Sequence, residues 1–211
     1  MFDSPETWKA IAANSEPLIS VIAFNYIVPG FSDNNIVRAL SKDWTVGGIM
    51  RYASGQPIPV PASQNQLNAL TFQTTRMNRV PGVPLYLEDI NGSIDPNKDF
   101  VLNPAAWVDP AAGQYGSSPA FYDDFRYQRR PDEQFSIGRV FPLAGGKELS
   151  LRAEFFNAFN RTSMNNPDAT NPLQTQTRNA QGVPTAGFGR INTGTTFGPP
   201  RSGQLVARVS W

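Results

Sequence analysis

The sequence predicts an all-β protein: an antiparallel meander that forms part of a transmembrane outer-membrane β-barrel, with long irregular loops. Three observations predict this fold class. Apolar and polar residues alternate over 149–156 and again over 203–210, and a period of two places the two sets on opposite faces of a strand. The second of these segments leads to an aromatic residue, Trp211, in step with its apolar face. Short and long connections between the expected strands follow one another in turn.

The composition narrows the function. The chain has 211 residues, enough for one domain or two. Its 18 basic and 17 acidic residues give a net charge of +1, which supplies no electrostatic reason to expect a nucleic-acid partner. Cysteine and histidine are both absent, so disulfides, thiolate metal sites and histidine-based catalysis are excluded. No run of about 18 apolar residues occurs, so the sequence predicts no transmembrane helix.

Three strands are expected before the alternating segments near the end of the chain. Residues 18–28 are rich in β-branched and aromatic residues, which is typical of a strand. Residues 43–54 follow a polar connection, and the glycine pair inside them suits a curved or closed sheet. Alternation returns at 134–141, where Arg139 interrupts an otherwise apolar face. At the edge of a membrane, the long side chain of an arginine can extend to the interface.

The last two strands, expected at 148–159 and 203–211, carry most of the candidate site. Their polar face is predicted to line the lumen of the barrel and to wall a solute path; it comprises Ser150, Arg152, Glu154, Gln204 and Arg208. Aromatic girdles flank the apolar band of outer-membrane barrels. Four aromatic side chains are therefore predicted at the two membrane interfaces: Phe141, Phe155, Phe159 and Trp211.

The lengths of the connections favour a membrane barrel over a soluble sandwich. Residues 29–42 and 142–147 are short connections, whereas 55–130 and 160–199 are long and rich in proline, glycine and asparagine. Barrels of the outer membrane have short periplasmic turns on one side and longer extracellular loops on the other. We therefore expect the two long connections to be extracellular loops, since a soluble sandwich has no reason to sort its loops in this way.

The long loops contain two clusters that could carry chemistry. Asp95, Asn97 and Asp99 have the spacing of a calcium loop, but the glycine and the glutamate that such a loop needs are replaced by Phe100 and Ala106. Around Tyr127, the residues Arg126, Arg129 and Arg130 form a basic-aromatic cluster, which we interpret as a solvated loop mouth in preference to an anion site. We predict no catalytic, cofactor-binding or metal-binding residue, and no enzyme activity.

Several pieces of the sequence carry a family resemblance. They are DWTVGGIMRYASGQPI (43–58), NPAAW (103–107) with GQYG (113–116), DEQFSIGRVFPLAGGKELSLRAEFFNAFNRTSMNNP (132–167), and the FGRINTG and PRSGQLVARVSW segments within 188–211. These pieces resemble the C-terminal end of TonB-dependent receptor barrels, especially the Oar-like family. They cover about half of the chain and nearly all of its expected strands, in order.

The resemblance implies a role in uptake for the parent protein. It implies transport of a solute across the bacterial outer membrane, driven through the TonB complex. Outer-membrane lipid and the barrel-assembly machinery are further expected partners. No plug domain or TonB box is present, and residues 1–17 contain no recognisable signal peptide. We therefore expect residues 1–211 to be a single C-terminal barrel fragment, with TonB acting through a missing N-terminal part.

Two alternative functions stay open at the level of sequence. One is a soluble or secreted all-β binding module, for instance a carbohydrate-binding sandwich whose large loop is the binding surface. The other is a passive porin-like barrel. For a receptor of the kind that the resemblance implies, the choice of solute is expected to depend on the loops and on a plug.

Overall fold

The computed structural model describes residues 9–30, 33–65, 75–194 and 198–211. The chain divides into two compact units, each assembled from three separate segments. The strand unit comprises Leu18–Ala53, Arg130–Ser163 and Gly198–Trp211, and the loop unit comprises the described parts of Met1–Pro17, Ser54–Arg129 and Met164–Phe197. We describe each unit by itself.

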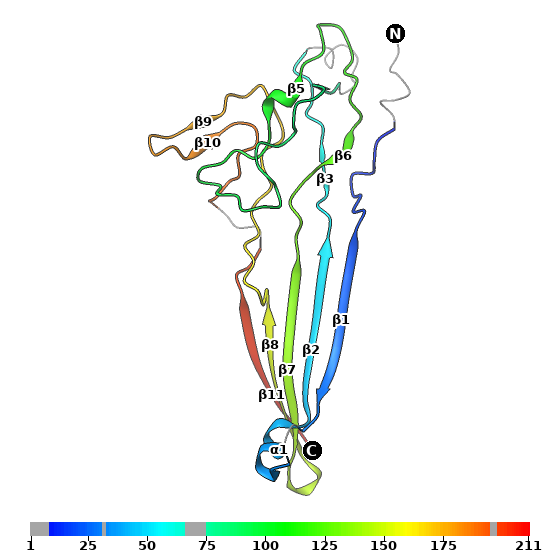
Figure 1. Cartoon of the computed structure of the whole chain (residues 1–211), viewed down its shortest axis with the longest axis vertical. Coiled ribbons are helices and arrows are strands. Elements are labelled where there is room, and N and C mark those ends of the chain that lie inside the picture. Colours follow the sequence, from blue (N-terminus) through cyan, green and yellow to red (C-terminus); the bar gives the residue numbers. More distant parts are fainter. Residues whose placement is uncertain (1–8, 31–32, 66–74, 195–197) are drawn as a thin grey trace. The chain divides into compact units, whose positions relative to one another are not determined.

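The strand unit is built on one five-stranded antiparallel sheet. Its order, β1-β2-β7-β8-β11, follows the order of the chain, which confirms the predicted meander (Figure 1). The strands are β1 (Ile19–Val28), β2 (Trp44–Ala53), β7 (Asp132–Pro142), β8 (Glu148–Phe156) and β11 (Ser202–Ser210). The sheet is not closed within this chain, because β1 and β11 each pair with only one strand among the described residues.

The end of β8 corrects the expected strand 148–159. The strand stops at Phe156, and the next residue, Asn157, has φ of 47° in the left-handed region. Asn160 also has a positive φ, at 52°. Asparagine tolerates this region better than most residues because its short polar side chain bonds locally. The chain therefore turns at these asparagines, and Phe159 lies beyond the strand.

The register of the sheet separates an apolar face from a polar one. Residues directly opposite each other in adjacent antiparallel strands point to the same side. One row across all five strands therefore comprises Phe24, Gly48, Phe135, Phe155 and Gly203, and the next comprises Tyr26, Val46, Ile137, Ala153 and Leu205. A row on the other face comprises Asn25, Gly47, Ser136, Glu154 and Gln204.

The connection between β1 and β2 contains a short helix that the sequence analysis treated only as a polar connection. Helix α1 spans Asn35–Ser41. The Asn34 side chain caps its N-terminus by accepting hydrogen bonds from the backbone N–H groups of Ile36 and Val37, at 3.0 and 3.3 Å. The β7–β8 connection is a tight turn, as expected, with a 3-10 turn, η3, at Ala144–Gly146.

The loop unit has a hydrophobic core, which the sequence analysis did not predict for the two long connections. Short strands pair as β3 (Pro57–Pro59) with β6 (Phe121–Arg126), β4 (Asn78–Arg79) with β5 (Trp107–Val108), and β9 (Thr177–Arg178) with β10 (Pro184–Ala186). The fully buried apolar side chains are Ile58, Met77, Val101, Leu102, Ala106, Phe125 and Phe188. Within the described part of the chain, no helix is both long and apolar enough to cross a bilayer.

Candidate functional site

A hollow of about 640 Å³ lies over the polar face of the five-stranded sheet. Two glycines, Gly47 and Gly138, lie on this face of β2 and β7 and leave room where side chains would otherwise project. Hydrogen-bonding side chains from four strands line the hollow: Asn25, Thr45, Gln134, Ser136, Arg152 and Glu154. The arrangement offers a solute several donors and acceptors along one wall.

Glu154 is the centre of a polar chain on β8 and β11. Its Oε1 atom lies 2.8 Å from Nη2 of Arg152, and its Oε2 atom accepts a hydrogen bond from Nε2 of Gln204. Gln204 is the residue directly opposite Glu154 in the sheet. Because the Arg152 side chain is more than half exposed, the ion pair contributes at most about 1 kcal/mol to stability. These groups are therefore available to a solute at small cost to the fold.

The structure places all five residues predicted to face the lumen on this one side of the sheet. Ser150 lies opposite Arg208, and Arg152 lies opposite Val206, which brings an apolar side chain into the polar face. Four lining residues that the sequence analysis did not name come from β1, β2 and β7: Asn25, Thr45, Gln134 and Ser136. Alternation along those strands contained the signal, but apolar residues such as Ile27 and Ile49 share their face.

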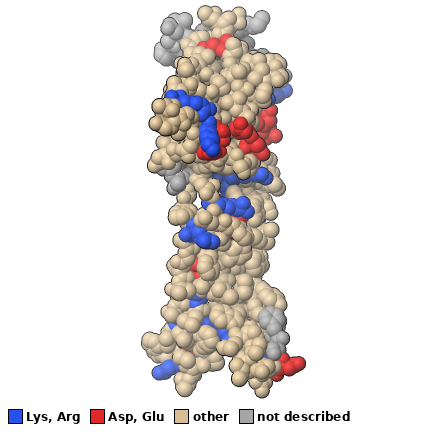
Figure 2. Space-filling view, turned by 60° about the vertical axis from the view of Figure 1, so that its left-hand side comes forward, with Lys and Arg blue, Asp and Glu red and all other residues tan. Residues whose placement is uncertain are grey.

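The four predicted interface aromatics belong to the other side of the sheet and to its two ends. Phe141 is paired with Leu149 near one end, and Trp211 follows β11 at that end with 93% of its surface exposed. Phe155 is paired with Phe135 toward the opposite end. The apolar rows of the sheet lie between these two ends. In the view of Figure 2, which does not separate apolar from uncharged polar residues, several basic groups are scattered over the lower half of the face shown. An apolar band with aromatic ends is the pattern of a lipid-facing barrel wall.

Phe159 joins the aromatic group although it lies outside β8. Its ring meets the Phe135 ring edge-on, with centroids 5.6 Å apart, and the Arg161 guanidinium lies 5.8 Å from its centroid. Nε of Arg161 also contacts Oε1 of Glu133 at 2.7 Å. Glu133 is fully buried, and its Oε2 atom has no hydrogen-bond partner. The backbone N–H of Ala158 also donates to the carbonyl oxygen of Glu133, at 3.0 Å. The segment after β8 is thus held against the start of β7 by an aromatic contact, an ion pair and a backbone hydrogen bond.

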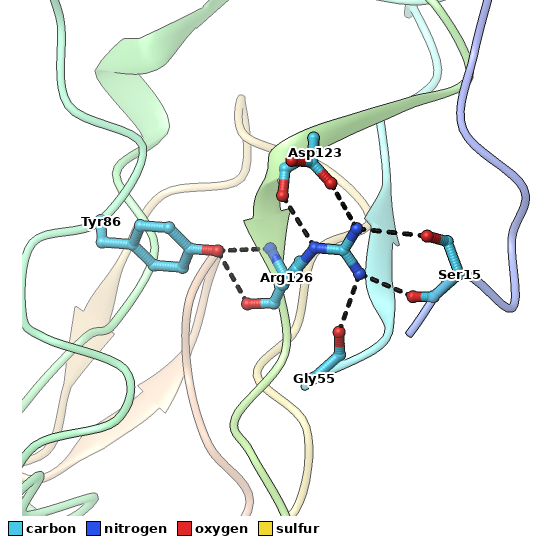
Figure 3. Close-up of polar contacts among 5 residues, drawn as sticks. All are labelled: Ser15, Gly55, Tyr86, Asp123 and Arg126. Atoms are coloured by element: carbon cyan, nitrogen blue, oxygen red, sulfur yellow. Dashed lines mark hydrogen bonds and ion pairs between the residues drawn. The ribbon is translucent and has the colours of Figure 1, made fainter. Parts of the chain in front are cut away.

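In the loop unit, Arg126 is a structural residue, which corrects its interpretation as part of a solvated loop mouth. Only 14% of its side chain is exposed. The guanidinium donates to the backbone carbonyl oxygens of Ser15 and Gly55, at 2.6 and 3.0 Å, and contacts Oδ1 of Asp123 at 2.5 Å (Figure 3). A guanidinium group has five N–H donors in a rigid planar arrangement. Arg126 can therefore join the segments that contain Ser15, Gly55 and Asp123.

Tyr86 completes this junction from the opposite side. Its hydroxyl donates to the backbone carbonyl of Arg126 at 2.7 Å and accepts from the backbone N–H of the same residue at 2.5 Å (Figure 3). Burial raises the pKa of the Tyr86 hydroxyl to about 12, because the charged phenolate is poorly solvated there.

A second hollow, of about 370 Å³, lies beside this junction, and two of the four carboxylates that line it are already paired with arginines. Asp123 is bonded to Arg126, and Asp124 is paired with Arg79 at 2.7 Å. At the calcium-like spacing, a hydrogen bond from Lys98 lowers the pKa of Asp95. Among the described residues, no three acidic side chains lie together in a group that could hold a metal ion.

Comparison with known proteins bears on the fold and the site together. Residues 6–204 match the sequence model of the family described as "Outer membrane beta barrel domain". No curated protein and no solved structure gives a match. The matched region contains β1, β2, β7 and β8 in full, with their apolar and polar faces. The chain belongs to the outer membrane beta barrel domain family.

Proposed function

We propose that this outer-membrane barrel protein is the C-terminal segment of a TonB-dependent receptor that takes up a solute. One observation carries the uptake proposal: the polar face of the sheet holds a hollow of about 640 Å³ while the opposite face is apolar. A barrel wall of this kind separates a water-filled path from lipid. Involvement of TonB rests on the resemblance at 132–167 and 188–211.

The proposed receptor binds its solute without chemical conversion and has three expected partners: outer-membrane lipid, the barrel-assembly machinery and the TonB complex. The protein acts as a transporter and not as an enzyme, and the hollow binds its solute by hydrogen bonds and by the charges of Arg152 and Glu154. Outer-membrane lipid contacts the apolar face, and the barrel-assembly machinery inserts the protein. The TonB complex acts through a part of the receptor other than this wall. Because the family is one of the outer membrane, a soluble carbohydrate-binding module is no longer an alternative.

The test measures which solutes disappear from the growth medium. Cells that carry the gene are compared with cells from which it is deleted, each with and without functional TonB, and the medium is profiled by mass spectrometry. The proposal expects at least one solute whose depletion needs both the gene and TonB. A solute whose depletion needs the gene alone would make the protein a passive porin-like barrel, and depletion that depends on neither would overturn the uptake proposal.

A matched pair of variants connects the uptake to the hollow. Glu154→Gln removes the charge that Arg152 pairs with and changes the polar face, whereas Leu205→Ile changes only the apolar face. We expect the first variant to change the apparent affinity for the solute and the second to leave it unchanged, at equal amounts of folded protein. Equal uptake by both variants would place the solute path elsewhere.

A further inference from the structure

Helix α1 exposes three large apolar side chains. Ile36, Val37 and Leu40 have 72%, 48% and 69% of their surfaces exposed, and no residue of the helix is buried. At 100° per residue these three side chains fall within one arc of about 100°. Arg38 and Ser41 lie on the remaining surface of the helix. Among the residues that the structure describes, none covers the apolar stripe of this seven-residue helix, so the stripe calls for an occupant.

The C-terminal end of α1 is attached to the apolar face of the sheet. The backbone carbonyl of Leu40 accepts hydrogen bonds from Nε1 of Trp44, at 2.8 Å, and from Nη1 of Arg139, at 3.1 Å. Trp44 and Arg139 are directly paired across β2 and β7 and belong to the row that continues with Leu151 and Ala207. The helix is therefore continuous with the surface that faces lipid in a barrel of this family.

The level at which α1 joins the sheet has the composition of a membrane interface. The Arg139 guanidinium lies 4.9 Å from the centroid of the Phe141 ring. The indole N–H of Trp44 donates a hydrogen bond to the backbone carbonyl of Leu40. Aromatic residues with a polar group are enriched at bilayer interfaces. Figure 1 shows α1 at the same end of the sheet as the β7–β8 turn and the C-terminus. Short turns mark the periplasmic side of such barrels.

We propose that α1 lies in the interface of the periplasmic leaflet, with Ile36, Val37 and Leu40 inserted among phospholipid chains. The basic side chains of Arg38 and Lys42 reach the headgroups, as in other helices that lie along a membrane surface. The occupant is lipid because the apolar stripe extends a lipid-facing wall and is fixed to it by Trp44 and Arg139. This inference rests on the outer-membrane location and does not require the TonB-dependent uptake proposed above.

The absence of cysteine allows a direct test. Single cysteines at Ile36, Leu40 and, as the matched control on the polar side, Arg38 are labelled with an environment-sensitive fluorophore in the full protein reconstituted in phosphatidylcholine vesicles. Brominated phospholipids then quench labels that touch lipid, and iodide quenches labels in water. We expect bromine to quench the labels at 36 and 40 several-fold more than the label at 38, most strongly with bromines near the headgroup. The reverse order for iodide is expected.

Three outcomes decide against the proposal. Equal iodide quenching at 36, 38 and 40 would place α1 in water and overturn it. Quenching between labelled molecules that disappears on dilution in lipid would assign the stripe to a second copy of the chain. A label at Leu205 on β11 keeps the two proposals apart, because it reports whether the sheet's apolar face contacts lipid. Bromine quenching at 205 without quenching at 36 and 40 overturns the helix proposal alone.

Discussion

The rings of Phe24 and Phe135 meet above Gly48, which lies on the strand between them. Their centroids are 6.2 Å apart and their planes are inclined by 54°. A Cβ atom at Gly48 would lie 2.7 Å from Cε1 of Phe24 and 2.9 Å from Cδ1 of Phe135. The glycine of β2 therefore permits an aromatic contact between β1 and β7, two strands that do not pair with each other.

Substitution of Gly48 by alanine is expected to break this contact. We expect a loss of about 0.5–1.5 kcal/mol in the free energy of unfolding, the range for an aromatic pair, because the added methyl group displaces the Phe24 ring. The measurement is urea unfolding of the protein in lipid vesicles. In a Phe24→Leu background the same substitution should cost much less, and an equal cost in both backgrounds would contradict the explanation.

The Glu133–Arg161 pair should behave as a buried charge with a partly exposed partner. Arg161→Ala leaves the Glu133 carboxylate without its cation, and breaking a buried pair in this way costs about 3–5 kcal/mol. The folded fraction, followed by heat modifiability in gel electrophoresis, should fall strongly. The double variant Arg161→Ala with Glu133→Gln should recover most of it, since no uncompensated charge remains. A double variant as unstable as the single one would contradict this account.

Removal of the Tyr86 hydroxyl should loosen the loop unit without affecting the sheet. Tyr86→Phe leaves the N–H and the carbonyl of Arg126 without their partner, which costs about 1–3 kcal/mol when such groups are buried. Hydrogen exchange should become faster in β6 and stay unchanged in β7 and β8. Tyr115→Phe is the control, because its hydroxyl makes no hydrogen bond among the described residues. Unchanged exchange in β6 would show that the junction does not depend on Tyr86.

Alkaline pH should destabilise the loop unit through the same residue. The pKa of Tyr86 is raised to about 12 in the folded protein, whereas that of an unfolded tyrosine is about 10. Below pH about 10 both states are protonated and the stabilisation is complete; it is lost between about 10 and 12, since the unfolded chain releases its proton first. An absorbance titration of the protein should show a phenol that titrates late and that Tyr86→Phe removes. A titration unchanged by that substitution would assign the late phenol to another tyrosine.

The five-stranded sheet could be predicted because alternation of apolar and polar residues is visible within a single strand, without knowledge of its neighbours. Alternation over 203–210 and 149–156 fixes both the strands and their faces, and the register confirms that Glu154 and Gln204 lie opposite each other. The polar positions of β1 and β2 were missed because Asn25 and Thr45 share their face with Ile27 and Ile49, so that the polar pattern is diluted.

The core of the loop unit and helix α1 were not predicted, for different physical reasons. Ile58 stands between two prolines and Phe188 between two glycines, so no period of two or 3.6 marks them as core residues. Their burial depends on segments far apart in the chain. The helix did leave a signal, the Asn34 cap before Ile36, but a seven-residue helix is marginal without tertiary contacts.

Cysteine accessibility along one strand tests the assignment of the two faces. Gln204 and Arg208 lie on the polar face of β11, and Leu205 and Val209 lie on the apolar face. Single cysteines at these four positions, in a sequence that has none, are treated with a charged, water-soluble thiol reagent in intact outer-membrane vesicles. Positions 204 and 208 should react, because a polar barrel face contacts water, and positions 205 and 209 should not, because the reagent does not enter lipid. Detergent-denatured protein serves as the control in which all four react equally.

Equal reaction of the four cysteines in the membrane would remove the argument for a polar lumen. Reaction at 205 and 209 alone would show that the apolar face, and not the polar face, contacts water.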